Sequence, residues 1–155
     1  MASFEVGVYA VYTHAMEAMM SNKVEYRSAR EAREHFKDIL DAADDGRPAT
    51  VTRDARRVAA VDADRLVHFL TRVRPSRAEA VAENDSWSLF IPGLPVAADG
   101  ATLDEAVEEM IDALRDYAED WADRLRLAPN HADNWGVVQI VALASHDELR
   151  DWLLA

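Results

Sequence analysis

Four times along this chain, a serine or threonine is followed three residues later by a glutamate. The pairs are Ser28 and Glu31, Ser76 and Glu79, Thr102 and Glu105, and Ser145 and Glu148. This arrangement is called a capping box. The hydroxyl and the carboxylate accept hydrogen bonds from backbone amides that the first turn of a helix leaves without partners. The four pairs therefore predict four helix starts, and the segments between them must supply the strands.

The first pair introduces an amphipathic helix that lies between short strands. Its apolar residues follow at helical spacing: Ala32, Phe36, Ile39, Leu40 and Ala43. Gly46 and Pro48 end this helix. Strands are predicted at residues 24–27, 49–53 and 58–62, and the polar turn 54–57 joins the last two in a hairpin. The turn lacks glycine, which favours a looser or longer hairpin, and a second helix begins at Asp62 or Asp64.

Ser76 starts a short third helix that fades near Asn84 and completes the first part of the chain. The second part predicts another small module, in which residues 87–91 form a strand that can pair with residues 96–98. Thr102 starts a long amphipathic helix, the apolar run 137–143 predicts a central strand, and Ser145 starts the last helix. The predicted fold class is α+β: a β-α-β-β-α unit followed by a β-α-β-α module.

The composition changes around Asn84 and Asp85, which places a domain boundary there. The predicted parts are a leader of uncertain role (1–22), an N-terminal domain (23–84) and a C-terminal domain (85–155). Residues 1–80 hold 13 basic and 13 acidic residues, whereas residues 81–155 hold 4 and 16, so the whole net charge of −12 lies in the second half. This asymmetry indicates two surfaces with two different partners.

Several classes of function find no support in the residues. The chain has no cysteine, which excludes disulfides and thiol chemistry and favours a reducing cytoplasm. No apolar run approaches the ~20 residues that cross a bilayer. A nuclease metal site needs carboxylates from several elements that converge in one concave site. The nearby acids Asp99, Asp104, Glu105 and Glu108 lie mostly on one exposed helix face and do not show that arrangement. We therefore expect no enzyme activity, catalytic residue, metal or cofactor, and no membrane partner.

The order and spacing of elements in residues 23–72 resemble the Phd/YefM ("prevent-host-death") antitoxins. The matching features are the strand Val24-Glu25-Tyr26, the segment Ser28-x-x-Glu31-Ala32-Arg33-x-x-Phe36-x-x-x-Leu40, Gly46, the strand Val51-Thr52-Arg53 and the strand Val58-Ala59-Ala60-Val61. The resemblance implies a homodimer that binds operator DNA. Arg33 and Arg53 match family positions that contact DNA, and Arg30, Arg56 and Arg57 are candidates for phosphate contacts.

The apolar residues of this unit predict how two copies would pair. A unit of about fifty residues has a thin core by itself, and a symmetric pair matches a palindromic operator. The predicted dimer core comprises Phe36, Ile39, Leu40 and Val51.

The second half resembles the HicB-type antitoxin domain in the stretch LFIPGLPVAADGATLDEAVEEMIDAL. A toxin that cleaves mRNA binds a polyanion and needs a basic cleft, which an acidic helix complements. The resemblance implies a RelE-like mRNA endonuclease as partner. The candidate toxin-binding residues are Glu105, Glu108, Glu109, Asp112, Asp116 and Trp135. The alternative is a solvated helix face that keeps the chain soluble.

These observations favour a type II antitoxin that neutralises a toxin and represses its own operon. The alternative is a stand-alone transcriptional regulator whose second half senses a ligand or binds another protein.

Overall fold

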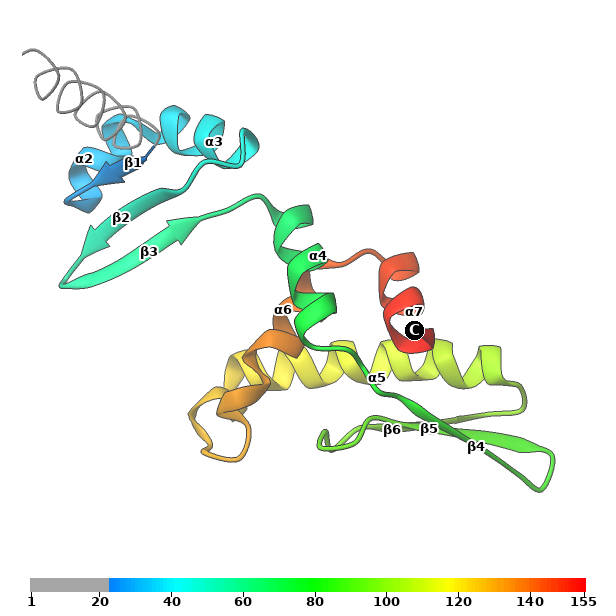
Figure 1. Ribbon diagram of the computed structural model, residues 1–155. Coiled ribbons are helices and arrows are strands. Elements are labelled where there is room, and N and C mark those ends of the chain that lie inside the picture. Colours follow the sequence, from blue (N-terminus) through cyan, green and yellow to red (C-terminus); the bar gives the residue numbers. More distant parts are fainter. Residues whose placement is uncertain (1–22) are drawn as a thin grey trace, which may run out of the picture. The chain divides into compact units, whose positions relative to one another are not determined.

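The computed structural model describes residues 23–155, so the predicted leader 1–22 lies outside the described residues. The chain divides into two compact units, the first ending at Asp62 and the second spanning Ala63–Ala155 (Figure 1). The predicted boundary at Asn84 and Asp85 instead falls at the turn of a hairpin within the second unit. The difference arises because helix α4 (Ala63–Val73) packs against helix α6 (Trp135–Leu143).

The first unit places two short helices against a three-stranded sheet of order β1-β2-β3. Its elements are β1 (Val24–Tyr26), α2 (Ala29–Glu34), α3 (Phe36–Asp44), β2 (Ala49–Arg53) and β3 (Arg56–Ala60). The Ser28 hydroxyl accepts from the Glu31 amide at 3.2 Å, which confirms the predicted helix start. The predicted single helix is divided at His35, whose ring stacks on Tyr26 with 5.3 Å between ring centroids.

The hairpin between β2 and β3 is tighter than its sequence predicts. Only Asp54 and Ala55 lie between the paired residues Arg53 and Arg56, and both adopt positive φ angles of 48° and 63°. A two-residue turn with both residues in the left-handed region matches the twist of antiparallel strands. The expectation of a looser or longer hairpin was therefore wrong, because residues other than glycine accept this strain here.

The second unit packs a three-stranded antiparallel sheet, β4-β5-β6, on one side of a long helix. Its strands are β4 (Glu79–Glu83), β5 (Ser86–Phe90) and β6 (Ala97–Gly100); its further helices are α5 (Leu103–Asp123) and α7 (His146–Leu154), and two 3₁₀ turns, η1 (Leu125–Leu127) and η2 (Ala132–Asn134), precede α6. The starts predicted at Thr102 and Ser145 are confirmed, since both side chains accept from the backbone amide three residues on.

Two predicted elements of the second unit have the wrong type. The helix predicted from Ser76 is strand β4, because the Ser76 hydroxyl accepts from the nearby Ala78 amide and Arg77 adopts a φ of 50°, which no right-handed helix allows. The strand predicted at 137–143 is helix α6. A short, wholly apolar run does not distinguish a buried strand from a buried helix by its periodicity.

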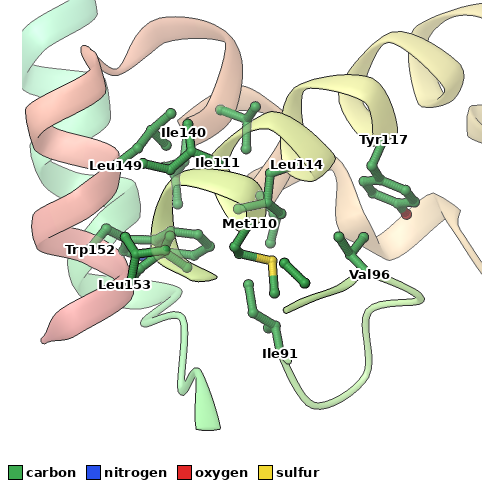
Figure 2. Close-up of a cluster of buried hydrophobic side chains, with 14 of the residues drawn as sticks. Ile91, Val96, Met110, Ile111, Leu114, Tyr117, Ile140, Leu149, Trp152 and Leu153 are labelled. Atoms are coloured by element: carbon green, nitrogen blue, oxygen red, sulfur yellow. The ribbon is translucent and has the colours of Figure 1, made fainter. Parts of the chain in front are cut away.

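The core of the second unit lies along the inner face of α5. Met110, Ile111 and Leu114 are fully buried and meet Ile140 of α6 and Leu149 of α7 (Figure 2). Because a buried apolar side chain of this size contributes about 1.5–3 kcal/mol, this cluster holds α5 in place and leaves its other face to solvent.

Candidate interaction surfaces

The predicted DNA-contacting arginines are exposed, and most of them lie on one face of the first unit. Val51 of β2 and Val58 of β3 are paired, and their side chains face the helices. Arg53 and Arg56 are paired two residues nearer the hairpin tip, so their side chains point to the same face of the sheet. Arg33, in the last turn of α2, borders that face too. The structure thus brings Arg33, Arg53 and Arg56 to the helix-bearing side of the sheet.

The remaining two arginines are placed differently. Arg57 is paired with Thr52, so its side chain points to the opposite face of the sheet, which Glu25 shares. A hydrogen bond from Lys23 lowers the pKa of Glu25, and the charge of Arg57 adds to that effect. Arg30 is exposed on α2 with Glu34 at 3.6 Å. Pairs this exposed contribute little to stability, so Arg30 is available to a phosphate.

An apolar groove of about 540 Å³ opens between α2–α3 and the β2–β3 hairpin. Its lining includes Phe36, Val51 and Val58. Ile39 is buried, whereas Phe36 and Leu40 are 60% and 49% exposed, so half of the predicted dimer core lies outside the core of the single chain. The cause is the interruption at His35, after which the buried side of α3 is formed by Ile39 and the alanines that follow it.

The core that the described residues of the first unit form is correspondingly small. Among residues 23–62, the buried cluster consists of Ala32, Ile39, Ala42 and Ala49, three of which are alanines. A cluster built mainly of alanines buries little apolar surface, so residues 23–62 have a thin core by themselves. The exposed apolar groove is a surface that a partner would cover.

Helix α5 carries the acidic face that the sequence predicts, but part of it is neutralised within the chain. Arg150 of α7 binds both Asp104 and Glu108, the latter at 2.9 Å, and His146 lies 2.9 Å from Glu108. Glu105 accepts from the Ala101 amide at 2.9 Å. Glu105 and Glu108, both candidate toxin-binding residues, are therefore held by the second unit's own contacts.

Fewer acidic residues in the C-terminal half of α5 are held by ion pairs within the described chain. Asp112 is 3.2 Å from Arg115, while Asp116, Glu119 and Asp123 have no ion pair within residues 23–155. The sequence prediction omitted Asp123, although its spacing of seven residues from Asp116 places both on one helix face. Glu109, the remaining acidic candidate, is exposed on the same helix.

A hydrogen-bonded loop positions the sixth candidate, Trp135. The Tyr117 hydroxyl lies 3.0 Å from Nδ1 of His131 and accepts from the Asn134 amide group at 2.7 Å, and Trp121 Nε1 donates to the His131 carbonyl at 2.8 Å. These bonds tie the loop to α5 directly before α6 begins. Trp135, the first residue of α6, remains 50% exposed.

Replacing Tyr117 with phenylalanine tests this loop. The hydroxyl meets both His131 and Asn134, and Asn134 is buried. Leaving a buried polar group without its partner costs about 1–3 kcal/mol. We expect Tyr117→Phe to lower the free energy of unfolding by about 2 kcal/mol in urea titration, whereas the exposed Asp133→Ala, in the same loop, should change it by less than about 0.5 kcal/mol. Equal stability of Tyr117→Phe and wild type would contradict a structural role for these bonds.

Within residues 23–155, no three histidine, aspartate or glutamate side chains cluster closely enough to hold a metal ion. No helix in that range has the length and apolar character needed to cross a membrane.

Comparison with solved structures finds a protein of the same fold. A protein from Syntrophomonas wolfei subsp. wolfei, described as the antitoxin part of a proposed toxin/antitoxin system, has a crystal structure that matches with a TM-score of 0.70. The match has 21% sequence identity and covers 84% of this chain and 94% of the other, which shows a shared fold. No curated protein sequence matches this chain.

Residues 20–153 match the family PHD_like, described as "Antitoxin of toxin-antitoxin, RelE / RelB, TA system". Because the match spans most of the 155 residues, the chain belongs to this antitoxin family. It is thus an antitoxin of a toxin–antitoxin system, for which the family implies a toxin partner of the RelE/RelB type.

Proposed function

We propose that this chain is a cytoplasmic antitoxin whose second unit binds and neutralises a RelE-like mRNA endonuclease. Family membership carries the proposal, and the charge of the second unit supports it. Residues 63–155 contain 18 acidic and 8 basic residues. A toxin that binds mRNA presents basic surface, and complementary charge speeds association and favours the correct partner.

Co-expression tests this part of the proposal directly. The full chain, with an affinity tag, is produced together with the protein encoded by the adjacent reading frame. We expect the two proteins to co-purify, and we expect growth arrest caused by that protein alone to be relieved by the chain. Independent purification without relief of growth arrest would refute the toxin-binding role.

We propose further that the first unit forms a homodimer that binds operator DNA and represses the operon. The groove at Phe36, Val51 and Val58, which residues 23–155 leave open, supports pairing, since a symmetric copy would cover the same apolar surface. The exposed arginines beside it, with the resemblance of residues 23–72 to Phd/YefM antitoxins, support DNA contact. Arginine binds phosphates and guanine edges through its planar fork.

The first DNA prediction concerns Arg53, whose side chain is 75% exposed. Arg53→Ala should weaken operator binding by roughly tenfold to a hundredfold, because a lost arginine contact costs about 1–3 kcal/mol. If Arg53 contacts a phosphate, the slope of log K against log salt should fall by about one. Fluorescence anisotropy with the promoter fragment at several salt concentrations measures both quantities.

Two further variants give this experiment its control. Arg126→Ala removes an exposed arginine of the second unit and should leave operator affinity unchanged. Arg57→Ala probes the opposite sheet face from Arg53 and Arg56. A loss of affinity in Arg57→Ala together with wild-type binding by Arg53→Ala would place the DNA on the other face and contradict the assignment of Arg53.

A further inference from the structure

Helix α6 is apolar around its whole circumference, yet it is covered on only part of it. Its sequence, WGVVQIVAL, has one polar residue, Gln139. A helix of this kind is normally buried on all sides. Here α4 and α5 cover the side formed by Val137, Val138, Ile140 and Val141, while Trp135, Ala142 and Leu143 are exposed. The exposed face of α6 is therefore a surface that the second unit itself leaves without a partner.

The uncovered face forms one wall of a groove between α5 and α6. The groove has a volume of about 440 Å³. It is hollow because several of its lining side chains are small: Ala118 and Ala122 from α5, and Ala142 from α6. Trp135 lies four residues before Gln139, a partly exposed lining residue, and so stands on the same exposed face of α6. A large exposed aromatic ring beside a depression is typical of an interface anchor.

The charges at the edge of the groove indicate the chemistry of its occupant. Glu119 lines the groove, and Asp112, Asp116 and Asp123 follow the same side of α5 at helical spacing. Arg115 is the one cation among the lining residues, and Asp112 lies 3.2 Å from it. The edge thus carries net negative charge. A second copy of this chain would bring the same acidic edge against itself, which repulsion opposes, whereas a basic protein surface is attracted.

We propose that this groove binds a basic amphipathic helix of the toxin, with Trp135 as the apolar anchor and Glu119, Asp116 and Asp123 as contacts for lysine or arginine. The proposal rests on the toxin-binding function proposed above and specifies where that binding occurs. Helix-in-groove recognition uses apolar residues spaced by three or four positions. The lining of α5 from Arg115 to Ala122 spans roughly 11 Å, which accommodates about two turns of such a helix.

This assignment divides the acidic residues of α5 into two groups with different roles. Asp104 and Glu108 are bound by Arg150 and hold α7 in place, so they belong to the second unit's own structure. The acids of the C-terminal half lie at the edge of the groove. The sequence predicted a toxin-binding surface along the whole helix. The proposed surface covers only the half of α5 that adjoins α6.

The test measures the affinity of the full chain for the adjacent-frame protein by calorimetry. Trp135→Ala should weaken binding by roughly thirtyfold or more, as loss of an anchor residue does. Ala122→Trp should block the groove with a similar or larger loss. Leu127→Ala, at another exposed apolar residue of the same unit, should bind like wild type. Circular dichroism and thermal unfolding verify that each variant is folded.

A charge-matched pair tests the basic character of the occupant. Glu119→Lys should weaken binding by about tenfold at low salt, with the difference from wild type shrinking at high salt. Asp151→Lys makes the same charge change on the exposed side of α7 and should have little effect. Hydrogen exchange in the complex should show new protection at residues 115–123 and 135–143.

The outcomes separate the two proposals. If the wild-type chain binds the adjacent-frame protein and the three groove variants bind equally well, the toxin-binding function stands and the groove assignment is overturned. Protection confined to segments other than 115–123 and 135–143 overturns it as well. If the wild-type chain does not bind that protein at all, the proposed function fails and the groove assignment fails with it.

Discussion

Replacing Phe36 with aspartate is expected to convert the proposed homodimer into a monomer. Phe36 is 60% exposed in the single chain and lines the apolar groove of the first unit. A symmetric interface contains the residue twice, and loss of each anchor costs about 2 kcal/mol. The dimer dissociation constant should therefore rise about a thousandfold. Sedimentation equilibrium measures the shift, and operator affinity should fall with it because each monomer reaches only one half-site.

The matched control for this variant is Leu127→Asp. Leu127 is 79% exposed, so the change introduces the same charge at an exposed apolar residue of the second unit. We expect this control to remain dimeric with unchanged operator affinity. If Phe36→Asp sediments as wild type does, the groove at Phe36 is not the dimer interface.

Replacing Gly100 with alanine is expected to destabilise the second unit strongly. A Cβ atom at this position would lie 2.4 Å from the backbone nitrogen of Ala106 and 2.8 Å from Cβ of Glu105. Because the clash involves the first turns of α5, only a shift of β6 or of the helix relieves it. Overpacking of this kind costs typically 1–3 kcal/mol and occasionally more. We expect a loss of about 3 kcal/mol, measured by urea unfolding.

Gly93→Ala separates this steric effect from the general cost of replacing a glycine. Gly93 has a φ of 85°, and nothing lies within 4 Å of a Cβ built there. The cost of alanine at Gly93 is the backbone strain alone, about 1 kcal/mol. Should Gly100→Ala prove no more destabilising than Gly93→Ala, the close approach of β6 to α5 is not a packing constraint.

Local signals in the sequence predicted most helix starts but not all of them. The boxes at Ser28, Thr102 and Ser145 are helix caps in the structure. Ser76 has the same spacing but forms a turn, because its hydroxyl accepts from the amide two residues on and Arg77 adopts a left-handed conformation. The same residue types serve both arrangements, and which one forms depends on whether the following segment pairs with β5.

The type of α6 and the position of the boundary depend on contacts distant in sequence. The apolar run 137–143 becomes a helix because α4 and α5 offer it helical packing partners. The same contacts assign α4 to the second unit, although its sequence follows the first unit without a linker. The change of composition at Asn84 and Asp85 marks a hairpin turn, where polar residues with positive φ are favoured.

The sequence predicts that α5 carries many acidic residues, but it does not predict which of them are free to bind a partner. Arg150 neutralises Asp104 and Glu108 from positions 46 and 42 residues away, a pairing that no periodicity within α5 indicates. The groove beside Ala118 and Ala122 likewise requires α6 as its second wall. The exposed Phe36 follows from the interruption of the helix at His35, which the apolar spacing does not reveal.

The hairpin tips are expected to affect how readily proteases cleave the chain. Asp54, Ala55, Asn84 and Asp85 all hold left-handed backbone conformations that glycine would adopt without strain. Asparagine and aspartate tolerate this conformation better than other residues with a Cβ atom, so the strain falls mainly on Ala55, and we expect the β2–β3 tip to open more often than a glycine-containing turn would. Since proteases cleave the opened form, we expect substitution of Ala55 to change the rate of proteolysis while the partner surfaces stay the same.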